Sequence, residues 1–289
     1  MRKDGLMPWL YIGPTLLILA AYLVYPTLNT LYLSFLDKRS ENFVGLDNYV
    51  WTFTSKTMQV AFRNNLLWMV LCTALTVSLG LVLAVMADRV RYESPLKSTI
   101  FLPMAISFAG AGVIWKFVYA FRPAGKPQIG LLNAFWTGSF GQEPIGWLVN
   151  RATNNFALIV AFVWIWTGFC MVILSAAYKG IPKELLEAAR VDGANEWQVF
   201  WRIIIPTMMP TLAVVTTTMI INVLKVFDIV YVMTNGDHGT EVIANRMYKE
   251  MFHFHNFGRA SAIAVILLLV IIPVMAANIR RFQEQEALR

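Results

Sequence analysis

Long stretches without a charged residue constrain this chain more than any other feature. Four segments, at 5–36, 64–87, 152–178 and 260–279, contain no Asp, Glu, Lys or Arg. An α-helix crosses the hydrocarbon core of a bilayer with about 20 apolar residues, because it satisfies its own backbone hydrogen bonds. With 57% hydrophobic and 14% charged residues and a mean hydropathy of +0.57, the sequence predicts an all-α integral membrane protein.

Two further apolar segments have charged ends. One meets Lys116, and the other runs into Lys225 and Asp228. With these two, the predicted transmembrane helices are at about 9–36, 64–87, 99–121, 155–178, 204–235 and 259–279. Prolines in or at the ends of these spans predict bent helices; they are Pro26, Pro103, Pro206, Pro210 and Pro273. The polar stretches at 37–63 and 122–154 are too short for a core of their own, so we expect one transmembrane domain over residues 1–289.

The distribution of basic residues predicts the orientation in the membrane. Arg2 and Lys3 precede an apolar run that is far longer than a signal-peptide core, so we interpret the first helix as a retained anchor. The N-terminal tail, the loops at 88–98 and 179–203 and the C-terminus hold 12 basic residues, whereas the other three loops hold 10 over a greater length. This density favours cytoplasmic termini.

The net charge of +7 does not indicate a nucleic-acid partner. The basic residues are dispersed over membrane-flanking loops and form no continuous stripe, as expected for anchoring at the lipid interface. Cys72 and Cys170 both fall inside predicted spans, where we expect them to act as small apolar residues.

A polar segment between the fourth and fifth spans carries strong helix signals. Pro182 suits a first turn, and the run after it, Lys183-Glu-Leu-Leu-Glu-Ala-Ala-Arg190, consists of good helix formers. Gly193 suits the left-handed position that ends a helix, and Asn195 suits the cap of a second, interfacial one. An apolar side is expected from Leu185, Leu186, Ala188 and Ala189. The residues alone allow either a connector without a partner or a docking element.

The motif Glu187-Ala-Ala-Arg-Val-Asp-Gly193, followed by an apolar run that closes at Ile205-Pro206, resembles the EAA motif of permease subunits of binding-protein-dependent ABC importers. Two further segments are similar to the carbohydrate-uptake type: Phe101-Leu-Pro-Met-Ala-Ile-Ser107, and Lys225-Val-Phe-Asp228 followed by Met233-Thr-Asn-Gly236. The resemblance covers essentially the whole chain. It is strongest to maltose and glycerol-phosphate permeases, and above all to alpha-glucoside or glucosylglycerol permeases.

This resemblance implies a fold, a function and partners. It implies a type I ABC importer permease with six spans and a cytoplasmic coupling helix, in a bacterial inner membrane. The residues implied in coupling to the ATPase are Glu184, Glu187, Ala188, Ala189, Asp192 and Gly193. The implied partners are a second homologous permease subunit, two copies of a cytoplasmic ATPase subunit and an external substrate-binding protein. ATP and Mg would be bound by the ATPase subunits, and this chain would bind no cofactor.

Ionisable groups inside a span are costly and are therefore functional candidates. Lys225 and Asp228 are three residues apart, and Asn222 precedes them by one turn. Two interpretations stay open: an ion pair that orients a helix, or polar groups that bind a sugar or polyol in a cavity. Aromatic faces for a sugar could come from Trp115, Tyr119, Trp164 and Trp166.

Signs of chemistry within the chain are sparse. The sequence has no phosphate-binding loop of the form G-x-x-x-x-G-K-[ST], so we expect no ATP hydrolysis by this chain and no catalytic residue. His238, His253 and His255 have no neighbouring carboxylate or cysteine at ligand spacing, which disfavours a metal site. The main alternative is an autonomous secondary transporter of a polar solute, but no internal repeat relates residues 1–145 to 146–289. A membrane-embedded enzyme would need a denser cluster of His, Asp or Glu.

Overall fold

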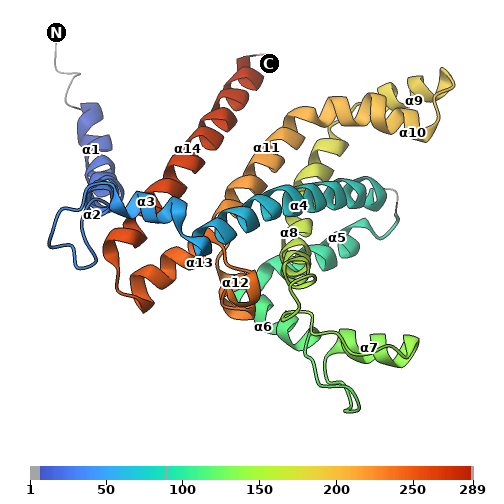
Figure 1. Cartoon of the computed structure of the whole chain (residues 1–289). Helices are drawn as coiled ribbons and strands as arrows, with labels where there is room; N and C mark the ends of the chain where they lie inside the picture. Colours follow the sequence, from blue (N-terminus) through green and yellow to red (C-terminus); the bar gives the residue numbers. More distant parts are fainter. Residues whose placement is uncertain (1–6, 89, 288–289) are drawn as a thin grey trace, which may run out of the picture. The chain divides into compact units, whose positions relative to one another are not determined.

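The computed structural model describes residues 7–88 and 90–287 (Figure 1). Arg2, Lys3, Arg89 and Arg289, which count in the orientation prediction, lie outside these residues. The α-helices are α1 (Met7–Leu19), α2 (Tyr25–Leu33), α3 (Asp47–Thr54), α4 (Lys56–Ala87), α5 (Glu93–Phe101), α6 (Phe108–Val118), α7 (Leu131–Phe140), α8 (Asn154–Lys179), α9 (Lys183–Val191), α10 (Glu196–Val199), α11 (Ile205–Leu224), α12 (Asp228–Met233), α13 (Ile243–Tyr248) and α14 (Phe257–Ala287). π-Helical turns lie at Ala20–Val24, Phe200–Ile204 and Lys249–His253, and 3₁₀ turns at Leu102–Ala105 and Asp237–Gly239.

The all-helical membrane fold is confirmed. Five continuous helices are long and apolar enough to cross a membrane, at Trp9–Leu33, Lys56–Ala87, Asn154–Lys179, Glu196–Leu224 and Phe257–Arg280. A sixth span results if the bent pair Glu93–Ala105 and Phe108–Val118 counts as one. The described residues contain no β-strand, only an isolated bridge between Leu36 and Phe43.

The chain divides into two compact units. The first consists of Met1–Gln59 and Arg246–Leu269, and the second of Val60–Asn245 and Val270–Arg289. The single transmembrane domain over residues 1–289 stays a prediction.

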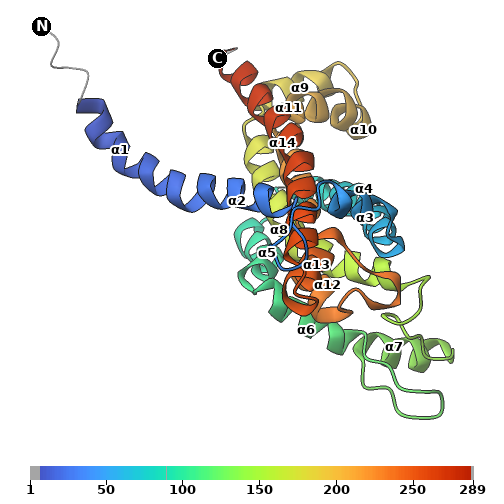
Figure 2. The same ribbon diagram turned by 60° about the vertical axis from the view of Figure 1, so that its left-hand side comes forward.

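In the first unit, α1 and α2 form one apolar helix through the π-helical turn between them (Figure 2). After α2 the chain reverses, and Asn48 of α3 holds the reversal by donating to the carbonyls of Ser34 (2.9 Å) and Leu36 (2.7 Å). Gly258, at the start of α14, packs so closely that a Cβ there would lie 2.1 Å from the Leu36 carbonyl oxygen. A glycine is therefore required at this contact.

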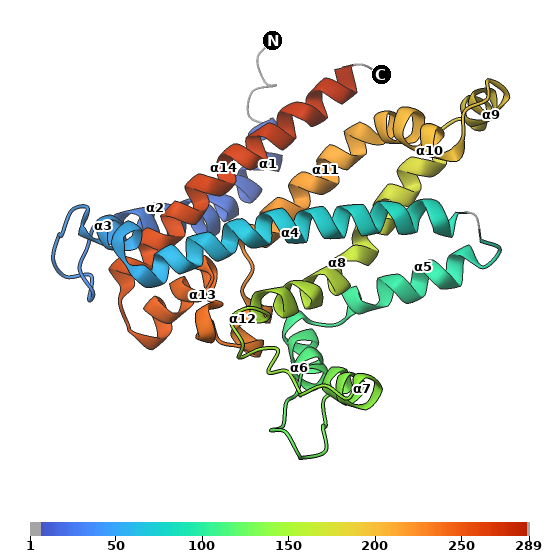
Figure 3. The same cartoon turned by 45° about the vertical axis from the view of Figure 1, so that its right-hand side comes forward.

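In the second unit, α8 is the central helix. In its most apolar window 72% of the residues are buried, and the helix crosses α4 and runs beside α5 (Figure 3). Glycines permit the close approach, because a Cβ on Gly80 of α4 would lie 2.5 Å from Cys170 Cβ. A Cβ on Gly168 would lie 2.5 Å from the Ile100 carbonyl oxygen. Both cysteines are buried and free, as the sequence predicts.

The third predicted span, 99–121, is not a continuous helix. The helix pair that covers it is bent by 100° between Ala105 and Phe108. Ile106 is extended (φ −87°, ψ 140°), and Ser107 caps α6 by accepting a hydrogen bond from the Gly110 N–H at 3.1 Å. Pro103 and a strong N-cap thus end one helix and start another.

The fifth predicted span, 204–235, extends beyond the end of the helix that forms it. Helix α11 ends at Leu224, and Lys225 and Phe227 leave helical geometry (φ −100°, ψ 13° and φ −139°, ψ −65°) before α12 begins at Asp228. Lys225 and Asp228 are both exposed, whereas Val226 and Ile229 are buried. The break therefore lets the charged side chains leave the core while their apolar neighbours stay inside it.

Candidate functional site

Helix α9 forms over Lys183–Val191, as predicted, and is the most polar exposed helix of the second unit. Its start follows α8 after only three residues, with Pro182 as N-cap. Its end is set by Gly193, whose φ of +85° is the left-handed conformation that favours glycine. Asn195 then caps α10 with a capping box, since its side chain accepts from the Gln198 N–H at 2.8 Å.

The apolar residues of α9 face two ways, rather than one as the sequence interpretation assumed. Leu186 and Ala189 pack against the core of the second unit. Leu185 is 44% exposed and Val191 is 87% exposed, and Ala188 between them is also exposed. The three are spaced three residues apart and form what we term the α9 stripe, Leu185, Ala188 and Val191.

Charged groups border the α9 stripe. Glu184, Glu187 and Asp192 are exposed, and Glu187 also lines a groove of about 560 Å³ under α9 together with Asp88, Lys179 and Arg190. The Glu196 carboxylate accepts a hydrogen bond from Arg190 at 2.8 Å and thereby raises the pKa of Arg190. Both side chains of this pair are about half exposed, so the pair orients α9 on α10 and contributes little to stability.

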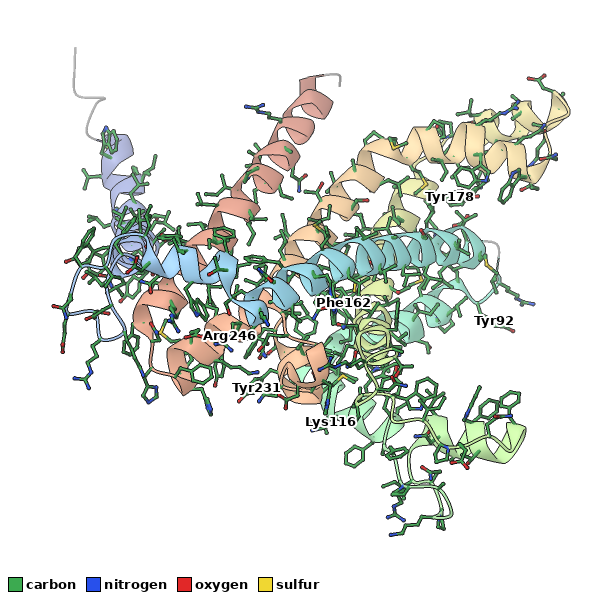
Figure 4. The ribbon with its side chains drawn as sticks, in the orientation of Figure 1. Tyr92, Lys116, Phe162, Tyr178, Tyr231 and Arg246 are labelled. Carbon is green, nitrogen blue, oxygen red and sulfur yellow. The ribbon has the colours of Figure 1, made fainter. Side chains whose placement is uncertain are left out.

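A second candidate site lies at the break between α11 and α12. A cavity of about 240 Å³ is lined there by Phe108, Phe162, Trp166, Asn222, Lys225, Val226, Phe227, Asp228 and Ile229. The predicted residues Asn222, Lys225, Asp228 and Trp166 thus come together. Figure 4 places Phe162 along α8, well away from Tyr178 at the α9 end of that helix, so the two sites are separate.

Aromatic rings form one part of the cavity wall. The Trp166 ring stacks with Phe108 (centroids 5.7 Å apart, planes at 22°) and lies 6.0 Å from Phe162. Trp166 is only 9% exposed, and its buried Nε1 has no hydrogen-bond partner among the described residues. An unpaired buried N–H is costly, so this N–H is available to a ligand hydroxyl that comes within reach of it.

Lys225 and Asp228 do not form the ion pair that was one of the two interpretations. No salt bridge joins them within 4.0 Å in the described part of the chain, and the helix break separates them. Trp115 and Tyr119 lie outside the cavity. Trp115 packs on Tyr119 (5.2 Å) and on Trp164 (5.8 Å), and Tyr119 donates to the Ala157 carbonyl at 3.1 Å. Their place on a solute pathway stays a prediction.

Two groups of residues with a structural role were not predicted from the sequence. Phe108 and Phe162 line the cavity, and the four-residue spacing of Phe162 and Trp166 on one helix was the available signal. Asparagines at the starts of α8 and near the start of α4 hold the loop after α12. Asn64 donates to the carbonyls of Gly239 and Glu241 (both 2.8 Å), and Asn154 donates to the His238 carbonyl (2.9 Å). The paired asparagines 64–65 and 154–155 before long apolar runs were the signal.

His238 and His255 have positive φ. Within residues 7–88 and 90–287, no group of three or more His, Cys, Asp or Glu side chains could hold a metal ion.

Comparison with known proteins gives three findings. Residues 76–284 match the protein family described as "Binding-protein-dependent transport system inner membrane component". The "Osmoprotective compounds uptake permease protein GgtC" of Synechocystis sp. is 68% identical over 280 residues, which cover 97% of this chain and 100% of that protein. The "Alpha-glucoside transport system permease protein AglF" of Rhizobium meliloti is 48% identical, over 96% of this chain and 82% of that protein.

Among solved structures, a chain of a bacterial ABC transporter involved in the import of the acidic polysaccharide alginate has a similar fold. The TM-score is 0.81 at 23% sequence identity, over 96% of this chain and 98% of that chain. At this identity the likeness concerns the fold alone.

Proposed function

Because this chain belongs to the family of binding-protein-dependent transport system inner membrane components, we propose that it is the permease subunit of an ATP-driven importer of neutral glucosides. The family match over residues 76–284 supports the permease assignment and the location in an inner membrane. The names of the two relatives, one an alpha-glucoside permease and one a permease for osmoprotective compounds, support the solute class.

In this proposal α9 is the coupling helix that docks on a cytoplasmic ATPase subunit. The exposed α9 stripe supports this role, since burying a Leu or Val side chain contributes about 1.5–3 kcal/mol. Glu184, Glu187 and Asp192 around it set the orientation, because exposed ion pairs contribute little affinity. Gly193 is the pivot between α9 and α10. In this proposal α9 faces the cytoplasm, and six spans would place both termini on the same side as α9.

The cavity at the α11–α12 break is the proposed solute contact of this chain. Sugars bind to planar polar groups combined with aromatic faces, and Asn222, Asp228, Lys225 and the Trp166 ring supply both. A second, homologous permease subunit completes the pore, and an external binding protein delivers the solute. ATP and Mg bind to two ATPase subunits, where hydrolysis takes place, and this chain binds no cofactor. ATP then biases two states of the pore through its different contacts in each.

The experiment is affinity purification of the tagged chain in mild detergent from cells that express the whole transporter. Glu187→Lys is compared with wild type and with Glu143→Lys, a matched reversal at an exposed glutamate outside α9. We expect the ATPase to co-purify with wild type and with Glu143→Lys, and to be reduced with Glu187→Lys. Absence of any ATPase from folded wild-type protein would overturn the proposal in favour of an autonomous transporter.

The solute class has its own test. The purified complex, reconstituted in liposomes with its binding protein and internal ATP, should accumulate radiolabelled alpha-glucosides and not a charged sugar such as glucuronate. Uptake of glucuronate in preference to glucosides would refute the neutral-glucoside assignment and leave the permease assignment intact.

A further inference from the structure

A cluster of charged side chains joins the ends of α4, α5 and α8 beneath α9. Lys179, the last residue of α8, lies 2.6 Å from Glu93 of α5 and 3.7 Å from Asp88, which follows α4. Lys97 of α5 pairs with the same Glu93 carboxylate and donates to the Ser175 hydroxyl of α8. Glu93 is therefore shared by two lysines from two helices, and Lys179 links it to Asp88 at the end of α4.

One side of this cluster is buried. The Lys97 side chain is 15% exposed and Ser175 is 4% exposed, whereas the side chains of Glu93 and Lys179 are 28% and 50% exposed. Removing Glu93 would leave a largely desolvated ammonium without its carboxylate, which is costly. Ser175 and Lys179 are four residues apart, so they stand on one face of α8. They hold α5 at two successive turns, which fixes its direction as well as its position.

A short, hydrogen-bonded segment connects the cluster to α9. Between Lys179 and Lys183 lie only Gly180, Ile181 and Pro182. The Gly180 N–H donates to the carbonyls of Ala176 and Ala177 at 3.2 and 3.1 Å, and Ile181 is 5% exposed. A displacement of α9 therefore reaches Lys179 within one turn of chain.

The groove under α9 shows the same connection from the other side. Asp88 and Lys179 line it together with Glu187 of α9. Arg190 lines the groove as well and holds α9 to α10 through its pair with Glu196. Asp88 and Lys179 of the charged cluster thus border the same groove as Glu187 and Arg190 of α9, within the second unit.

We propose that Glu93 and Lys179 are positioning residues that make the ends of α4, α5 and α8 move together with α9, so that force applied to α9 reaches the pore. This inference rests on the proposed function, because it assigns the path by which ATPase movement enters the spans. Neither residue touches the solute or ATP. Their effect is on how much solute moves for each ATP hydrolysed.

The experiment uses the whole transporter with its binding protein in proteoliposomes. Solute uptake and ATP hydrolysis are measured together for wild type, Lys179→Met, Glu93→Gln and the conservative Lys179→Arg. Lys126→Met is the matched control, since Lys126 is an exposed lysine on the loop before α7. Thermal melting of each complex separates a loss of folding from a loss of coupling.

We expect solute moved per ATP to fall in Lys179→Met and Glu93→Gln by between about 2-fold and about 30-fold, the range typical of a coupling network. The ATPase subunits should stay bound, and hydrolysis should continue. Lys179→Arg should keep a ratio near that of wild type, because it keeps the charge that pairs with Glu93.

Three outcomes separate the possibilities. An unchanged ratio in both Lys179→Met and Glu93→Gln overturns the inference, even if their melting temperatures fall. An equal loss in Lys179→Arg and Lys179→Met also overturns it, since the charge would then be irrelevant. Failure of the wild-type complex to show ATP-driven uptake refutes the proposed function itself, and the inference with it.

Discussion

The turn between α9 and α10 allows a prediction in which backbone conformation is the only variable. Gly193 has a φ of +85°, and a Cβ built there would meet nothing within 4 Å. A substitution therefore causes no clash and acts through the backbone alone. The left-handed conformation costs an L-residue about 1–2 kcal/mol, less for Asn and more for a β-branched residue.

If docking of α9 requires this turn, that cost appears in the affinity for the ATPase subunit. A penalty of 1–2 kcal/mol corresponds to an affinity weaker by about 5- to 30-fold. We expect Gly193→Ala to fall in this range, Gly193→Val to lose at least as much, and Gly193→Asn to lose least. Gly141 offers the control, because it ends α7 with a φ of +61° and likewise has nothing within 4 Å of its Cβ position.

The assay is a titration of purified ATPase subunit onto nanodisc-embedded permease, followed by biolayer interferometry. The same exchanges at Gly141 should leave the affinity unchanged. Equal affinities for Gly193→Asn and Gly193→Val would refute the reasoning, because backbone conformation would then not be the limiting factor. So would a wild-type affinity for Gly193→Val.

Two further predictions concern the cavity and the core. Trp166→Phe keeps the aromatic face and removes the unpaired Nε1–H, so the KM for solute uptake should rise by about 2- to 13-fold, the value of one hydrogen bond. Trp164→Phe, a change outside the cavity, should leave the KM unchanged. An equal rise of the KM in both variants would contradict a role of Trp166 in solute binding. Gly80→Ala forces a Cβ against Cys170 and should destabilise the protein by about 1–3 kcal/mol, seen as a lower melting temperature in detergent. Gly13→Ala, where the added Cβ meets nothing within 4 Å, should not lower the melting temperature. Equal melting temperatures of the two variants would show that α4 and α8 can move apart to accept the added methyl group without loss of stability.

Local signals explain which parts of this molecule could be predicted from the sequence. The α9 turn was predictable because its determinants, Gly193 and the Asn195 cap, act within a few residues. Which side of α9 is covered was not, since Leu185 and Leu186 are equally apolar and only the tertiary packing separates them. A pattern along one helix shows a face but not the neighbour that covers it.

The same limit applies to the cavity. Asn222 and Trp166 were predicted separately and do meet, but Trp115, equally aromatic, packs elsewhere. Pro103 predicted a bend in the third span, but not one of 100°, because hydropathy carries no information on backbone geometry. Lys225 and Asp228 marked a charged end of the fifth span, and yet the sequence did not show that helical geometry ends at Leu224.

The π-helical turn at Phe200–Ile204 sets the rotational phase of the fifth span. A π turn holds one residue more than an α turn, and one residue corresponds to about 100° of rotation. The chain curves at this turn between α10 and α11 (Figure 3). The extra residue of the π turn therefore sets the direction in which every side chain of α11 points. This includes Asn222, which lies some eighteen positions, or about five helical turns, after the π turn. Adding or removing one residue in this short segment would therefore rotate the side chains of α11 that line the solute cavity.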